Sequence, residues 1–207
     1  MELKSDDINQ IVRSVMDRLD GKTSRSVSTG QLTVGIFTSL DEAVNAAAES
    51  QKKIRNLEFR AKIVQAMRET GKKYARELAE YAVAETGMGR VEDKFQKNFS
   101  QAEKTPGIED LRPEALSGDH GLTLTENAAW GVIASVTPST NPAATVINNS
   151  ISMIASGNAV VFAPHPAAKK VTQKTISLLN QAITGIDGPP NLLTTVAEPS
   201  IEIAQQL

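Results

Sequence analysis

The sequence contains no cysteine and only two histidines, His120 and His165. Without thiols the chain can form no disulfide bond and no thiolate metal site, and two imidazoles are too few for most zinc sites. We therefore expect no metal centre. Any chemistry that needs a nucleophilic thiolate would have to draw it from outside these residues.

A large excess of charge of one sign is also lacking, because 22 basic residues nearly balance 24 acidic ones and the formal net charge is -2. Such a balance creates no general field to attract nucleic acid or anionic lipid. No apolar run reaches the ~18 residues of a membrane span, and the first residues are too polar for a secretory signal. The composition therefore predicts a globular protein in the cytoplasm, with no nucleic-acid or membrane partner.

The first 33 residues form two predicted stretches. Residues 1–19 are expected to be an amphipathic helix, and residues 20–33, rich in Ser, Thr and Gly, a flexible linker. So short a helix is unstable alone in water, so its apolar face needs a partner. Composition leaves three partners open, namely another protein, its own domain or a second copy. The apolar stripe consists of Ile8, Ile11, Val12, Val15 and Leu19.

Residues 34–128 are predicted to be mainly helical. The apolar spacing predicts helices over about 41–55, 57–86 and 91–103, with a possible break of the second near Gly71. Gly87-Met88-Gly89 follows a helix, and position 92 is Glu, so we expect a helix C-cap there and not a dinucleotide fingerprint. The rest of this stretch is expected to be loop, with residues 122–125 a strand candidate.

Residues 129–207 alternate between strand and helix. Short β-branched runs predict buried strands, and helical periods separate them, which implies parallel strands with right-handed crossovers. The predicted fold class is α/β, an N-terminal helical segment followed by the first half of a doubly wound, Rossmann-like sheet. The expected strands are 130–136, 159–162 and 191–196, and the expected helices are 141–155, 167–184 and one capped by Ser200.

Two turns at the carboxyl ends of predicted strands are candidate sites, because ligands bind at that edge of an open α/β sheet. The first runs from Thr137 to Pro142. Asn141 could be an N-cap ahead of Pro142 at the first helical position, or it could face a ligand. The second contains His165 between two prolines. This histidine could be a turn residue or could reach the same edge as a functional group.

Several motifs resemble the CoA-acylating branch of the aldehyde dehydrogenase superfamily. The resemblance is strongest to members from ethanolamine-utilisation microcompartments and next to propionaldehyde members of the propanediol pathway, and it extends over almost the whole chain. The motifs that carry it are the run from Glu85 to Lys94 with Lys97-Asn98, the run from Val136 to Pro142, the run from Ile147 to Ile151, Gly157-Asn158 and the run from Phe162 to Pro166.

The resemblance implies the aldehyde dehydrogenase fold and the conversion of acetaldehyde, CoA and NAD+ to acetyl-CoA and NADH. Asn141 matches the family asparagine whose amide donates to the developing oxyanion. Hydrolytic relatives usually carry Lys at Ala163, and its absence fits a cleft that CoA must also enter. The resemblance places Thr137, Pro138, Ser139 and Thr140 on the nicotinamide side of the NAD site, and Pro164 and His165 near the adenosine.

The resemblance also implies partners and a location. Microcompartment members carry N-terminal targeting helices, so residues 1–19 are expected to bind a shell protein inside the compartment, and the complete enzyme is expected to be a homo-oligomer. Family members are over twice as long, and their catalytic Cys lies in the part without a counterpart here. We therefore expect the 207-residue chain alone to be inactive. The alternatives are a non-catalytic fragment, an interaction module bearing the docking helix, or the propionaldehyde-specific homologue.

Overall fold

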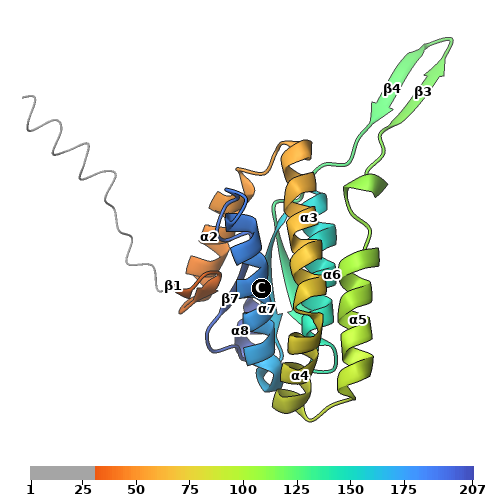
Figure 1. Ribbon diagram of the computed structural model, residues 1–207. Helices are drawn as coiled ribbons and strands as arrows, with labels where there is room; N and C mark the ends of the chain where they lie inside the picture. The colour runs from red at the N-terminus through yellow and green to blue at the C-terminus, as the bar shows by residue number, and fades with distance from the viewer. Residues whose placement is uncertain (1–30) are drawn as a thin grey trace, which may run out of the picture.

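The computed structural model describes residues 31–207. The predicted targeting helix at 1–19 and the linker up to residue 30 lie outside the described residues. The described chain forms one five-stranded sheet with helices on both faces and a separate two-stranded arm that projects from it (Figure 1).

Three parallel strands form the centre of the sheet, as the sequence predicts. Strands β5, β6 and β7 pair in that spatial order, and Val132 lies opposite Ala159 at the start of the first pair. All residues of β6 are buried, which explains its continuous apolar sequence. The bounds are β5 Val132–Thr137, β6 Ala159–Pro164 and β7 Leu193–Val196.

Two further strands extend the sheet beyond β7. Strand β2 (Ile36–Phe37) runs parallel to β7, and β1 (Gln31–Thr33) pairs antiparallel with β2. The predicted linker is therefore wrong over 31–33, and the predicted helical stretch begins with a strand. Strands of two and three residues are too short to show an alternating pattern, but they satisfy backbone groups along β7. The amide of Thr195 donates to the carbonyl of Gly35 at 2.8 Å.

The helices cover the two faces unequally. Helix α2 (Leu40–Gln51), capped by Ser39, packs on one face, while α6 (Pro142–Ala155) and α7 (Lys169–Thr184) cover the other. Helix α3 (Leu57–Lys73) packs across α6 and α7 as an outer layer (Figure 1). The hydrophobic core therefore lies between the sheet and these helices.

The long predicted helix over 57–86 is divided at Tyr74 and not at Gly71. Helix α4 (Ala75–Thr86) begins after Tyr74. Gly71 instead permits close packing, since a Cβ there would lie 2.8 Å from Cβ of Ala102 on α5. Gly87 ends α4 in the left-handed region at φ 67°, which confirms the predicted C-cap. Helix α5 spans Val91–Lys104, and the short helix η1 spans Ile108–Asp110.

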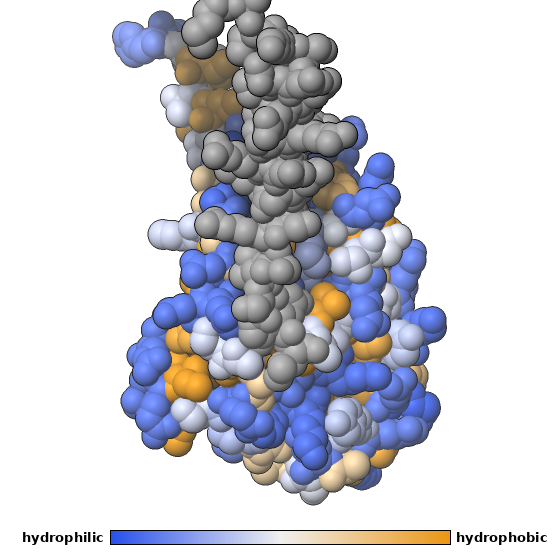
Figure 2. Space-filling model, turned by 90° about the vertical axis from the view of Figure 1, so that its left-hand side faces the viewer, coloured by the Kyte–Doolittle hydropathy of each residue, from blue (hydrophilic) through white to orange (hydrophobic). Residues whose placement is uncertain are grey.

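A hairpin arm lies before β5. Its second strand confirms the strand candidate at 122–125, and its first strand forms where loop and short extended pieces were expected. Its strands β3 (Glu114–Gly118) and β4 (Gly121–Thr125) pair antiparallel, and every residue in them is exposed. The arm, at the upper left in Figure 2, carries a hydrophobic group below a hydrophilic tip. Its exposed apolar side chains are Leu116, Leu122 and Leu124.

The C-terminal segment follows the sequence prediction. The short helix η2 (Pro166–Ala168) leads into α7, and Ser200 caps α8 (Ile201–Gln206) by accepting a hydrogen bond from the amide of Ile203. None of the helices within residues 31–207 is both long enough and apolar enough to cross a membrane.

Candidate functional site

The two candidate turns meet at one edge of the sheet. Thr137, the last residue of β5, lies opposite Pro164 at the end of β6. The amide of His165 donates to the carbonyl of Thr137 at 3.1 Å, which joins the two turns directly. The parallel pairing therefore brings together two segments that are more than twenty residues apart in sequence.

A cavity of about 430 Å³ opens between these strand ends and α8. Its walls are largely apolar, and the Thr137 hydroxyl is buried without a hydrogen-bond partner in the described part of the chain. Largely apolar walls suit the face of a heterocyclic ring. The cavity is lined by Val136, Thr137, Pro138, Ala163, Pro164, His165, Pro166, Ser200, Ile201, Ala204 and Gln205.

His165 has a local structural role at the mouth of this cavity. Its Nδ1 accepts a hydrogen bond from the amide of Ala167 at 3.1 Å, which closes the turn into η2. The side chain is exposed. Among residues 31–207, no group of three or more His, Asp or Glu side chains is placed to hold a metal ion. The turn interpretation of His165 therefore has direct structural support.

Asn141 occupies the N-cap position of α6, but its side chain does not cap the helix. Its carbonyl accepts from the amide of Thr145 at 3.0 Å, whereas its side chain makes no capping hydrogen bond within the described residues. Oδ1 instead accepts from Nζ of Lys97 on α5 at 2.9 Å. Side-chain capping is therefore wrong for Asn141, because the contact with Lys97 holds the Asn141 oxygen away from the amides of the first turn of α6.

Asn141 and Lys97 together line two adjoining hollows beside α5, one of about 280 Å³ and one of about 350 Å³. Thr140 lines the first of them. The seven predicted site residues thus fall into two groups that face different hollows. Thr137, Pro138, Pro164 and His165 face the cavity at the strand ends, Thr140 and Asn141 face α5, and Ser139 lies between the two groups in the chain.

Lys94 and Lys97 reach the turn from α5, although neither is among the site residues predicted from the sequence. Lys94 is buried, and its Nζ donates to the carbonyl of Thr140 at 2.7 Å. Burial, and to a smaller extent the charge of Lys97, lowers the pKa of Lys94 from its ordinary value. The sequence carries a signal for the burial of Lys94, because Lys94 shares the inward face of α5 with Asn98 and Ala102 at four-residue spacing.

The start of α7 is occupied by an internal anion. The carboxylate of Glu85 accepts hydrogen bonds from the amides of Lys170 and Val171 at 2.8 and 2.7 Å. The ammonium of Lys169 pairs with Glu198. These contacts use the groups that could otherwise bind a phosphate at this helix end.

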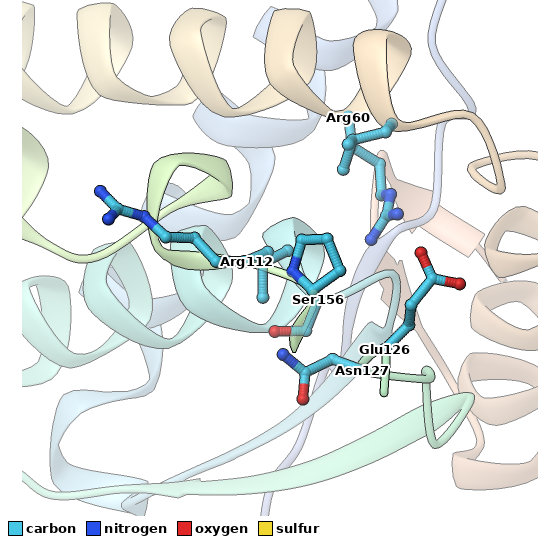
Figure 3. Close-up of a pocket in the computed structure, with 8 residues that line it drawn as sticks. Arg60, Arg112, Glu126, Asn127 and Ser156 are labelled. Atoms are coloured by element: carbon cyan, nitrogen blue, oxygen red, sulfur yellow. The ribbon is translucent and has the colours of Figure 1, made fainter. Parts of the chain in front are cut away.

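A separate cavity of about 200 Å³ lies at the other end of α6 (Figure 3). The Arg60 guanidinium and the Glu126 carboxylate extend into the space between them, whereas Arg112 extends away. Arg60 donates to the carbonyl of Ala155 at 2.6 Å and so satisfies the C-terminus of α6. This cavity lies at the amino ends of the strands, where open α/β sheets do not place their ligands. We therefore assign it a structural role.

Comparison with known proteins matches this architecture to one family. The profile described as "Aldehyde dehydrogenase family" matches residues 19–207. "Acetaldehyde dehydrogenase (acetylating) EutE" from Escherichia coli (strain K12) is 58% identical over 99% of this chain and 44% of its own length. "Propanal dehydrogenase (CoA-propanoylating)" from Salmonella typhimurium is 49% identical over 84% of this chain and 38% of its own length.

Solved structures agree with the sequence comparison. A propionaldehyde dehydrogenase from the Clostridium phytofermentans fucose utilisation bacterial microcompartment aligns with a TM-score of 0.81 and 43% identity, over 83% of this chain and 40% of that one. A Rhodopseudomonas palustris propionaldehyde dehydrogenase with bound propionyl-CoA aligns with a TM-score of 0.81 and 43% identity, over 88% of this chain and 41% of that one. The chain spans less than half the length of the relatives that it matches. It belongs to the aldehyde dehydrogenase family.

Proposed function

We propose that the protein acts as a CoA-acylating aldehyde dehydrogenase that converts acetaldehyde, CoA and NAD+ to acetyl-CoA and NADH in ethanolamine catabolism. The observation that carries this proposal is the side chain of Asn141, which sits at a helix N-terminus without capping it and directs its oxygen to Lys97. The higher identity to the acetylating relative, 58% against 49% for the propanal enzyme, favours acetaldehyde over the longer aldehyde.

In the proposed reaction, the thiolate of a catalytic cysteine attacks the aldehyde carbon, and the carbonyl π electrons move to the oxygen. This chain contains no cysteine, so the nucleophile belongs to the region of the relatives beyond the stretch matched here. The Asn141 amide nitrogen donates to the new oxyanion, a contact that strengthens as charge develops. When the oxyanion collapses, the carbon loses its hydrogen as hydride, for which a bound NAD+ would supply the acceptor, and a thioester remains. The CoA thiolate then attacks the thioester carbon, which releases the enzyme thiolate and forms acetyl-CoA.

The cavity at the ends of β5, β6 and α8 fits one ring of NAD, because its walls are largely apolar. NAD+ supplies the hydride acceptor when bound. We assign Thr137, Pro138, Ser139 and Thr140 to the nicotinamide side, and Pro164 and His165 to the adenosine side. Ala163 leaves the cavity wide enough for CoA to share it, and the bound propionyl-CoA of the R. palustris relative supports such access.

We further propose that the complete protein is a homo-oligomer inside a bacterial microcompartment, with residues 1–19 bound to a shell protein. The microcompartment origin of the C. phytofermentans relative supports the location. Support for self-association comes from the exposed leucines of the β3–β4 arm, which are Leu116, Leu122 and Leu124. An apolar group on a projecting arm is typical of a surface that packs on another subunit.

The test uses a hybrid enzyme in which residues 1–207 precede the remaining segment of the E. coli relative. Asn141→Ala should lower kcat for NADH formation by ~10²–10³-fold while the affinity for NAD stays nearly unchanged. Its melting temperature should stay close to that of the parent hybrid, because no capping bond is lost. Asn127→Ala, which removes an exposed amide at the opposite end of α6, is the matched control and should leave kcat unchanged.

A different outcome would overturn the proposed role. If Asn141→Ala keeps full kcat and only lowers the melting temperature, Asn141 stabilises α6 and does not stabilise the oxyanion. The 207-residue chain alone provides the blank reaction, since it cannot form the thioester.

A further inference from the structure

We propose that Lys97 is a positioning residue for Asn141, and that its ammonium fixes the direction in which the Asn141 amide donates. This inference rests on the proposed function, because it concerns the same oxyanion donor. Its central observation is the 2.9 Å contact between Nζ of Lys97 and Oδ1 of Asn141, which joins α5 to the β5–α6 turn across 44 residues of chain.

The chemistry of the two groups allows only one orientation of the amide. An ammonium has three N–H donors and no lone pair, so it can face the amide oxygen but not the amide NH₂. Rotating the Asn141 amide by 180° would place two donors against each other. Lys97 therefore directs Oδ1 toward α5 and Nδ2 away from it. An oxyanion needs the NH₂ end, so the lysine selects the catalytically useful orientation.

Within residues 31–207, no other contact of the Asn141 side chain fixes this orientation firmly. The Nδ2 atom makes only a long contact, 3.4 Å, with the hydroxyl of the adjacent Thr140. A capping bond to α6 would have fixed the amide in another direction, but it is absent within the described residues. Without Lys97, the amide would be held only weakly in the orientation that donates.

Lys94 holds the backbone of the same turn from one helical turn earlier on α5. Its ammonium donates to the carbonyl of Thr140 at 2.7 Å. This carbonyl belongs to the peptide that joins Thr140 to Asn141, so one lysine holds the main chain while the other holds the side chain. Gly89 makes room for Lys94, since a Cβ at Gly89 would lie 3.2 Å from its Cε.

The positive charge adds to the geometric effect. A cation at Oδ1 draws electron density toward the oxygen and makes the amide N–H a stronger donor. An arginine at position 97 would keep both effects, because it also has only donors, whereas a methionine of similar length would remove both.

The competing interpretation is an incidental surface contact. Lys97 is exposed, and hydrogen bonds of exposed lysines contribute little to stability. Stability measurements therefore cannot separate the two interpretations. A double-mutant cycle in kcat can, because a residue that acts through Asn141 has no effect once that amide is gone.

The experiment measures kcat and KM for acetaldehyde in the hybrid enzyme and in five variants, one of which is Asn141→Ala. Lys97→Met should lower kcat about tenfold, with KM within about twofold, and Lys97→Arg should restore most of the loss. In the Asn141→Ala background, Lys97→Met should cause no further loss. Lys104→Met removes an exposed lysine from the last turn of the same helix and should leave kcat unchanged. Melting temperatures of all variants check that they fold.

Two results overturn the inference while leaving the proposed function intact. The first is a Lys97→Met enzyme with the parent kcat, beside an Asn141→Ala enzyme that has lost activity. The second is an equal loss from Lys97→Met in both backgrounds, which would show that the lysine acts independently of Asn141. An Asn141→Ala enzyme with full kcat would instead overturn the proposed role of Asn141, and the positioning role would fall with it.

Discussion

The carboxylate of Glu85 binds the amide of Val171 at 2.7 Å, although the two residues are 86 positions apart in sequence. Glu85 lies in the last turn of α4, and Val171 lies in the first turn of α7. A second oxygen of the same carboxylate accepts from the amide of Lys170. One helix therefore caps another, in a position where α7 has no capping side chain of its own.

This relationship predicts a stability loss for Glu85→Ala. Removing the carboxylate leaves two amides of α7 without their partner and removes a negative charge from the helix N-terminus, at a cost of ~1–2 kcal/mol. Guanidinium unfolding of the purified 207-residue chain measures the change. Glu80→Ala, on the exposed face of the same helix, should change the free energy of unfolding by less than ~0.5 kcal/mol. Equal values for the two variants would contradict the capping role.

The β1–β2 turn makes a second stability prediction. Gly35 has φ +83°, and a Cβ there would lie 2.4 Å from the side-chain nitrogen of Asn180 and 2.6 Å from the carbonyl of Leu193. Gly35→Ala should therefore lower the free energy of unfolding by at least ~2 kcal/mol. Gly118→Ala in the exposed arm, where a Cβ meets nothing within 4 Å, is the control and should be nearly neutral. A tolerated alanine at position 35 would show that β1 and β2 do not pair as described.

The sequence predicted the central β-α-β pattern well because each of its elements carries a local signal. Strand β6 is buried throughout and reads as a continuous apolar run, and Ser200 precedes α8 with a clear capping residue. Strands β1 and β2 carry no such signal, since their five residues are too few for a period. The pairing of β2 with β7 joins Ile36 to Thr195, and no local pattern contains a contact over so long a stretch of sequence.

The candidate site was predictable on one side of the turn only. The run from Thr137 to Asn141 could be recognised as a candidate site from its position between a predicted strand and a predicted helix. The lysines of α5 could not be recognised in this way, because a lysine in a helix is ordinarily solvated. Lys94 is recognisable afterwards, since it occupies an inward position that the helical period reserves for buried residues. Only the packing of α5 against α6 brings it to the turn.

Ala163 provides a prediction about CoA. It lines the cavity at the strand ends, and hydrolytic relatives usually carry lysine at this position. In the hybrid enzyme, Ala163→Lys should raise KM for CoA several-fold, because the longer side chain narrows the cavity that we propose CoA and NAD share, while the affinity for NAD should not fall. Steady-state kinetics with CoA varied, and NAD binding followed by fluorescence, measure the two effects. Ala128→Lys, an exposed position, controls for the added charge. An unchanged KM for CoA would show that CoA does not pass Ala163.

The last prediction concerns residues 1–19, which lie outside the described residues, and it therefore rests on sequence alone. Their apolar stripe from Ile8 to Leu19 is too short to be a stable helix in water without a partner. Residues 1–21 fused to a fluorescent protein should give compartment-sized puncta in cells that make the shell. Ile11→Glu with Val15→Glu should disperse them, because two charges in the stripe prevent docking in an apolar groove. Gln10→Glu with Arg13→Glu, which places two negative charges on the face of the predicted helix opposite the stripe, is the control and should keep the puncta. Diffuse fluorescence from the unmodified fusion, with shells visibly assembled, would show that this segment does not direct the protein to the shell.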